Sequence, residues 1–101
     1  MKIIEKLSER IEEEICDAKS YTMMALETQE EYPDLSRTLY TIGLQEMEHM
    51  RMLHDAVAKM IDAYRRENGD PPERMMAVYE YLHHKHIEKA ADTKALQAMY
   101  K

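Results

Sequence analysis

The sequence predicts an all-α protein, a long antiparallel helical hairpin plus a third helix, and three observations lead to this. Hydrophobic residues make up 45% and charged residues 34% of the 101 residues, a composition typical of amphipathic helices. Apolar residues recur at spacings of three and four along most of the chain. The prolines fall in two short segments, around 31–34 and 68–72, which divide the chain into helical stretches. We therefore expect a single domain over residues 1–101.

The first helix is expected at about residues 3–30, with an apolar stripe that a single acid interrupts. The stripe consists of Ile4, Leu7, Ile11, Glu14, Ala18, Tyr21 and Ala25. Glu12 and Glu13 fall on the polar side of the helix, so only Glu14 is expected to face inward.

The second helix is expected at about residues 35–67, and its stripe carries two residues that can bind a metal. The stripe consists of Leu39, Ile42, Glu46, His49, Leu53, Ala56, Met60 and Ala63. Glu46 and His49 are three residues apart and therefore lie on the same side of a helix. Glu48 falls on the polar side.

Proline and glycine mark where these two helices should begin and end. Pro33 disfavours a helical conformation in the residue before it, and either Asp34 or Ser36 is suited to cap the second helix. Gly69 is suited to the left-handed position that follows a helix. The short connections at 31–34 and 68–71 favour antiparallel neighbours.

The third helix is expected at about residues 72–99, with a broader and less regular apolar face. It contains a second Glu-x-x-His pair, Glu80 and His83. If this helix folds back on the first two, one chain can supply these residues to a metal site within the monomer. The alternative for the same pair is a surface histidine cluster.

Charge and cysteine content exclude several functions. The net charge of −6 argues against nucleic acid, which requires a basic face, and favours attraction of cations. The single cysteine, Cys16, excludes an intrachain disulfide and any Cys-x-x-Cys metal module. The first residues become polar too soon for a signal peptide, and no apolar run reaches membrane length. We expect a cytoplasmic protein with no membrane partner.

Carboxylates and imidazoles in an apolar stripe are costly to bury unless something pairs with them. In an antiparallel hairpin, Glu14 should lie at about the same height as Glu46 and His49. Helical bundles that hold two metal ions use a Glu from each of two helices and a Glu-x-x-His from each of two others. One chain therefore carries half of such a site, and a two-fold dimer would complete it. Carboxylate oxygens and imidazoles suit Fe(II), with Mn(II) as the alternative.

Glu14 followed by Glu46-x-x-His49 resembles the first half of the ferritin-like superfamily, in particular rubrerythrin-type chains and most of all the encapsulated ferritins. The resemblance covers roughly residues 10–60. It implies that the chain dimerises, or forms a larger homo-oligomer, to rebuild a ferritin-like four-helix bundle with a di-iron ferroxidase centre. Glu14, Glu46 and His49 would then be the metal ligands and the catalytic residues.

The resemblance also implies what this iron-binding oxidoreductase would act on and where. It would oxidise Fe(II) to Fe(III) with dioxygen or peroxide, for iron storage or detoxification. An encapsulin-type shell is the partner that the resemblance suggests, which would place the chain inside a protein compartment of the cytoplasm. Two alternatives stay open: a rubrerythrin-like peroxidase or oxidase with an external electron donor, and a non-enzymatic helical interaction module whose inward acids only specify pairing.

Overall fold

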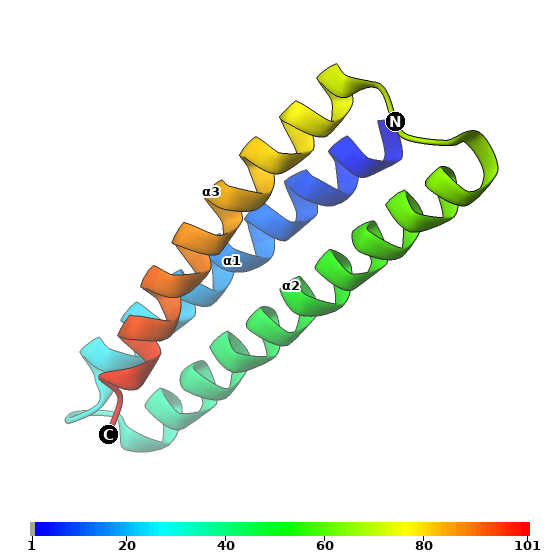
Figure 1. Ribbon diagram of the computed structural model, residues 1–101. Helices are drawn as coiled ribbons and strands as arrows, with labels where there is room; N and C mark the ends of the chain where they lie inside the picture. Colours follow the sequence, from blue (N-terminus) through cyan, green and yellow to red (C-terminus); the bar gives the residue numbers. More distant parts are fainter. Residues whose placement is uncertain (1) are drawn as a thin grey trace.

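The computed structural model describes residues 2–101 as three α-helices in an elongated bundle, 56 × 18 × 18 Å in extent. The helices are α1 (Lys2–Thr28), α2 (Pro33–Asn68) and α3 (Glu73–Ala98), and the described residues contain no strand. The all-α prediction is confirmed. Figure 1 shows α1 and α2 running antiparallel, with α3 returning in the direction of α1. None of the described helices is both long and apolar enough to cross a membrane.

Small residues bring α1 and α2 close together near the turn that joins them. Ala18, Thr22 and Ala25 of α1 and Ser36 of α2 are 0% exposed. A Cβ atom on Gly43 of α2 would lie only 2.9 Å from Thr22 Oγ1, so this approach requires glycine. Toward the other end, larger aliphatic side chains fill the core: Ile4, Ile11, Ile15, Met47, Val57 and Ile61.

The apolar stripe expected at the centre of α2 lies instead along one edge of the hairpin. Among its members Leu39 is buried, whereas His49 and Ala56 are exposed and the other residues are half-buried. The buried positions are Ser36, Leu39, Gly43, Met47, Val57 and Ile61. The apolar surface of α2 is wider than α1 alone can cover, and Gly43 lets α1 settle on the neighbouring stripe.

Over residues 2–101, the hairpin therefore has one long edge that no other segment covers. We call this edge the open face, and define it as Leu7, Glu14 and Tyr21 of α1 with Ile42, Glu46, His49, Leu53 and Met60 of α2. All of these residues are half-buried except His49, which is exposed. The open face is thus largely apolar, with a polar group midway along it.

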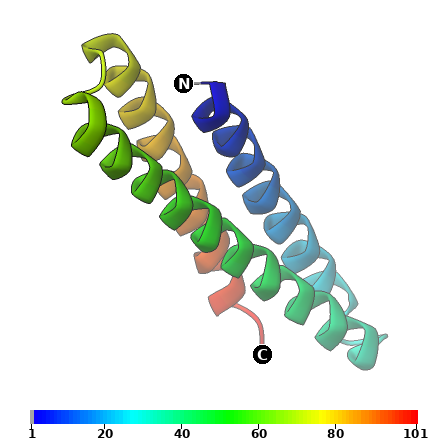
Figure 2. The ribbon, with the colours of Figure 1, turned by 90° about the vertical axis from the view of Figure 1, so that its right-hand side faces the viewer.

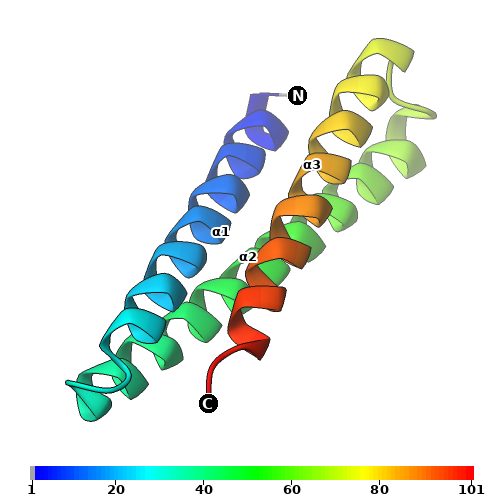
Figure 3. The ribbon, with the colours of Figure 1, turned by 90° about the vertical axis from the view of Figure 1, so that its left-hand side faces the viewer.

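The third helix, α3, packs on the opposite side of the hairpin. Lys89 of α3 forms an ion pair with Glu12 of α1, and Glu14 lies two residues further on, about 200° round the helix. At the C-terminal end, the ring of Tyr100 stacks on Tyr40 of α2 with centroids 4.1 Å apart. Figures 2 and 3 view the bundle from opposite sides: α2 runs in front of α3 in Figure 2, and α3 lies in front in Figure 3.

The C-terminal end of α2 follows the sequence signal, whereas the N-terminal end departs from it. Tyr32 occupies the N-cap position and no side chain caps the helix, so the expected cap by Asp34 or Ser36 is wrong. The Ser36 hydroxyl instead donates to Ala25 O at 2.6 Å, because it is buried between the helices. Gly69 ends the helix with a φ of 77°, which glycine adopts readily, and its N–H donates to Arg65 O at 3.0 Å.

Candidate metal centre

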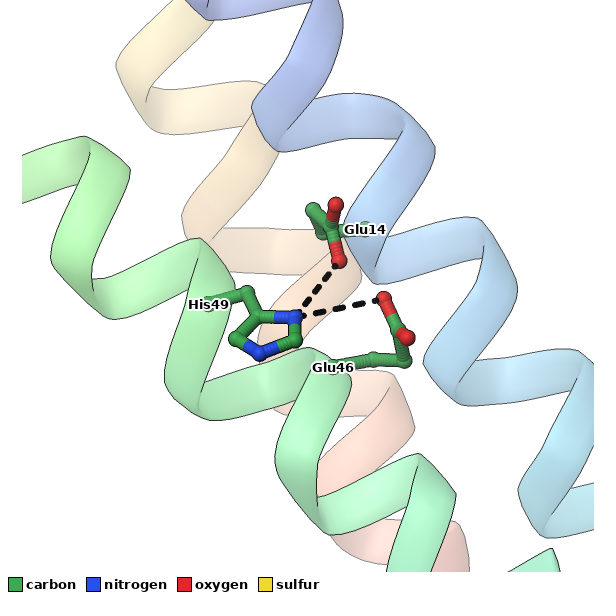
Figure 4. Close-up of side chains that lie close together, drawn as sticks. All are labelled: Glu14, Glu46 and His49. Carbon is green, nitrogen blue, oxygen red and sulfur yellow. Dashed lines mark ion pairs between the residues drawn. The ribbon is translucent and has the colours of Figure 1, made fainter.

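Glu14, Glu46 and His49 come together midway along the hairpin, as Figure 4 shows. His49 Nδ1 lies 3.4 Å from Glu14 Oε2 and 3.8 Å from Glu46 Oε2. One ligand atom from each of the three residues lies within 4.8 Å of the other two. In the described part of the chain, no other three His, Cys, Asp or Glu side chains meet in this way.

Helix geometry explains why these three residues meet. Glu46 and His49 are separated by slightly less than one turn of α2, so their side chains lie one above the other on one side of the helix. The short turn at Tyr32-Pro33 sends α2 back along α1, which brings Glu14 to the same height. The expected height of Glu14 relative to the Glu46–His49 pair therefore agrees with the structure.

The site lies on the open face and is only partly covered. The side chains of Glu14 and Glu46 are 23% and 20% exposed, whereas that of His49 is 55% exposed. The three side chains are thus at the edge of the hairpin, and not at its centre as the sequence stripe suggested. The two carboxyl groups lie between the helices while the imidazole faces outward, where a second molecule can reach it.

Among the described residues, no cationic side chain pairs with the two carboxyl groups except His49 when it is protonated. Glu14 Oε2 is buried and has no hydrogen-bond partner. The pKa of Glu46 is raised from 4.5 to about 7, first because of a hydrogen bond with the carboxyl of Glu14, and then because of burial and charge repulsion. Asp17 raises this pKa further, and His49 opposes the shift. The site in this state therefore holds less negative charge than its two acids would carry in water.

Two carboxylates and an imidazole are the donors of a site for a hard or borderline divalent cation. Fe(II), Mn(II) and Zn(II) all accept such a ligand set. A bound cation would supply the partner that Glu14 Oε2 lacks and would stabilise the ionised form of Glu46. The residues present therefore fit a metal ion.

The second Glu-x-x-His pair does not join this site. Glu80 is exposed on α3, and α3 lies on the other side of the hairpin from Glu14. His83 meets His54 of α2 instead, with His54 Nε2 and His83 Nδ1 2.8 Å apart. Sequence reasoning missed this histidine pair because His54 belongs to neither Glu-x-x-His motif. The only signal for it is that both histidines lie on helices joined by a short connection.

Comparisons with known proteins gave no match: no family pattern, no curated protein and no solved structure resembles the chain significantly. The interpretation of the site therefore depends on its residues and their geometry.

Proposed function

We propose that the chain is a ferroxidase whose di-iron carboxylate centre is completed at a homodimer interface. The observation that carries this proposal is the convergence of Glu14, Glu46 and His49 on the uncovered edge of a helical hairpin. A Glu from one helix and a Glu-x-x-His from the next are half of the ligand set of helical-bundle di-iron proteins. Two copies related by a two-fold axis would supply the four Glu and two His of the full set.

The composition of the open face supports a second copy of this chain as the partner. Apolar side chains flank the ligands along the whole edge, from Leu7 and Tyr21 on α1 to Ile42 and Leu53 on α2. A second hairpin laid on this edge would make four helices, bury these side chains and cover the exposed imidazole of His49. Burial would also exclude water from the carboxylates, which strengthens their attraction for a cation.

The charges near the site support cations as the substrate. The chain has a net charge of −6, and Asp17 lies near enough to raise the pKa of Glu46. A negative potential around the site raises the local concentration of cations. Glu13, which also lies beside the site in sequence, is paired with Arg10 at 3.0 Å and contributes less to this potential.

In the proposed reaction, two ferrous ions are oxidised together by dioxygen, with the balance 2 Fe(II) + O₂ + 2 H⁺ → 2 Fe(III) + H₂O₂. Glu14 and Glu46 would hold the ions through their carboxylate oxygens, and His49 would hold one ion through its imidazole. Because the pKa of Glu46 is raised to about 7, a proton must leave this carboxyl before iron binds, so iron and protons compete for it. Iron storage and detoxification are the functions that such oxidation serves.

An oxidation assay with matched variants tests the proposal. Fe(II) is added without oxygen, air is then admitted, and formation of Fe(III) is followed by its absorbance. We expect Glu46→Ala and His49→Ala to lower the rate to that of free Fe(II), while circular dichroism shows unchanged helicity. Glu48→Ala is the control, because Glu48 lies on the same turn of α2 but pairs with Arg51 at 2.5 Å and faces away from the site.

Two results would contradict the proposal. Oxidation by the Glu46→Ala variant at the parent rate would remove this centre. No oxidation by the parent protein, together with a higher stability when Glu14 and Glu46 are both replaced by Leu, would favour an interaction module instead, because apolar replacements often stabilise a fold at sites of buried charge.

A further inference from the structure

A second group of histidines lies between α2 and α3, away from the carboxylate centre. A pocket of about 420 Å³ separates these helices, and His54, His83 and His86 line it together with Met50. His54 Nε2 and His83 Nδ1 are 2.8 Å apart, so one of these ring nitrogens donates a hydrogen bond to the other. His54 lies five residues after His49, about 140° round α2, and therefore on a different side of the helix.

His86 gives an independent sign that the pocket binds something. This residue is 5% exposed, and its Nε2 is buried without a hydrogen-bond partner. Buried polar atoms without a partner are rare in folded proteins, and an ion or water commonly satisfies them. Burial also lowers the pKa of both His83 and His86, which favours the neutral imidazole, the form that binds a metal.

We propose that His54 and His83 form a zinc-type site that fastens α3 to α2, with the buried Nε2 of His86 as a further partner through a bound water. Two imidazoles on one tetrahedral ion have nitrogens about 3.3 Å apart, given Zn–N distances of about 2.0–2.1 Å. The distance of 2.8 Å between His54 Nε2 and His83 Nδ1 is close to this value. A small rotation of the two rings therefore admits an ion in place of the proton of their hydrogen bond.

The chemistry of the pocket selects the class of ion. None of the residues that line the pocket carries a carboxylate, which disfavours Mg²⁺, Ca²⁺ and Mn²⁺. Imidazole nitrogens with a nearby thioether, from Met50, favour Zn²⁺ and its neighbours in the first transition row. Arg51 also lines the pocket, but Glu48 and Asp55 bind its guanidinium and compensate its charge. Lys94 is the remaining cation of the lining.

An ion at this position would have a mechanical effect on the bundle. The middle of α3 is joined to α1 by the ion pair of Lys89 with Glu12, and its C-terminal end is joined to α2 by the stacking of Tyr100 on Tyr40. A bound ion would add a direct link between the middles of α2 and α3. Because the ion binds only the folded arrangement, it should raise the stability of the whole chain.

The test uses Co²⁺ as a spectroscopic probe. The protein is the 101-residue chain with both Glu46→Ala and His49→Ala, because these substitutions remove the carboxylate centre. We expect about one Co²⁺ per chain with the intense visible bands of tetrahedral coordination, and loss of these bands when Zn²⁺ is added. His54→Gln, His83→Gln and His86→Ala should each weaken binding at least about tenfold. His84→Gln is the matched control, because His84 is exposed on the same turn of α3. In the same Glu46→Ala and His49→Ala background, Zn²⁺ should also raise the thermal midpoint, and adding His54→Gln should abolish this rise.

The same measurements can overturn the site. In the Glu46→Ala and His49→Ala background, Co²⁺ affinity that is unchanged by His54→Gln or His83→Gln in a folded protein would overturn the site. An equal loss of affinity in His84→Gln would show binding to surface histidines instead. A thermal midpoint that does not respond to Zn²⁺ in the same background would exclude the link between α2 and α3 even if a further variant failed to fold.

Discussion

At the scale of single residues, the contact between Glu14 and Glu46 determines how the site responds to pH. Two carboxyl groups that lie together without a cation cannot both be ionised at low cost, and here Glu14 raises the pKa of Glu46 to about 7. The consequence is a carboxyl that titrates near neutrality on a partly exposed edge of the protein. Stability and metal binding should therefore both change with pH around 7.

We predict that the metal-free protein loses stability as the pH rises from about 5 to 8. The pKa of Glu46 is about 7 in the folded chain and 4.5 without these contacts, so the folded state binds the extra proton. This stabilisation is complete below 4.5 and is lost as the pH rises through about 7, with a size on the order of 1–3 kcal/mol. Chemical denaturation of the parent and of Glu46→Gln would measure it.

The Glu46→Gln variant is the control for the predicted dependence of stability on pH, because glutamine cannot titrate. Glu46→Gln should flatten the dependence on pH between about 5 and 8, and a variant with the same slope as the parent would assign the effect to another group. The affinity of the parent for iron should show the opposite trend to its stability. Iron should bind more tightly above pH 7, because binding displaces the proton of the Glu46 carboxyl.

Sequence patterns predicted that Glu14, Glu46 and His49 come together, but not the surroundings of these residues. The Glu46-x-x-His49 spacing and the single acid in the first stripe are local features, and helix geometry converts them directly into a shared position. The exposure of His49 depends on which stripe of α2 meets α1, and the small residue Gly43 decides this. Glycine counts as neutral in a hydrophobic pattern. The predicted stripe of α2 therefore lay beside the residues that contact α1 in the structure.

At the scale of helices, the closeness of α1 and α2 depends on Gly43. We predict that Gly43→Ala destabilises the protein by about 1 kcal/mol. The new Cβ would lie 2.9 Å from Thr22 Oγ1 and 3.3 Å from the backbone oxygen of Ala18, and such overpacking costs roughly 1–3 kcal/mol. The better helix propensity of alanine returns up to about 1 kcal/mol. Urea denaturation would give the net value.

Repeating Gly43→Ala in a Thr22→Ala background separates the cost of overpacking from the gain in helix propensity. Without Thr22 Oγ1 the nearest obstacle is gone, so Gly43→Ala should become neutral or stabilising there. A stabilising Gly43→Ala in the parent would mean that the helices are not held at this separation.

The third helix shows where the sequence was least informative. Its presence and bounds were predicted well, at 72–99 against Glu73–Ala98. Its buried side proved to consist of His86, Ala90, Thr93 and Gln97, of which only Ala90 is apolar. Polar side chains buried in this way leave no hydrophobic periodicity to read. Their partners, and the pairing of Lys89 with Glu12, come from distant parts of the chain.

At the scale of the whole molecule, the proposal requires two chains to meet on the open face. We predict that Fe(II) shifts the protein from monomer toward dimer in sedimentation experiments without oxygen, because metal ligated by both chains stabilises their association. Ile42→Gln should weaken this shift, since Ile42 lies on the open face one turn from Glu46.

Leu44→Gln is the matched control for assembly. Leu44 is 43% exposed and lies two residues from Ile42, about 200° round α2 and away from the open face. Both substitutions are uncharged, so neither changes the attraction of the site for cations. Equal effects of the two variants would mean that α2 does not associate through the open face.

The number of iron ions bound per chain at saturation is the measurement that tests the interface centre most directly. Anaerobic titration should reach a plateau near one Fe(II) per chain, that is, one di-iron site per dimer, with the plateau species sedimenting as a dimer. Glu80→Ala should leave the plateau unchanged, because α3 supplies no ligand to this centre. A plateau near two Fe(II) per monomeric chain, lost in Glu80→Ala, would contradict the account.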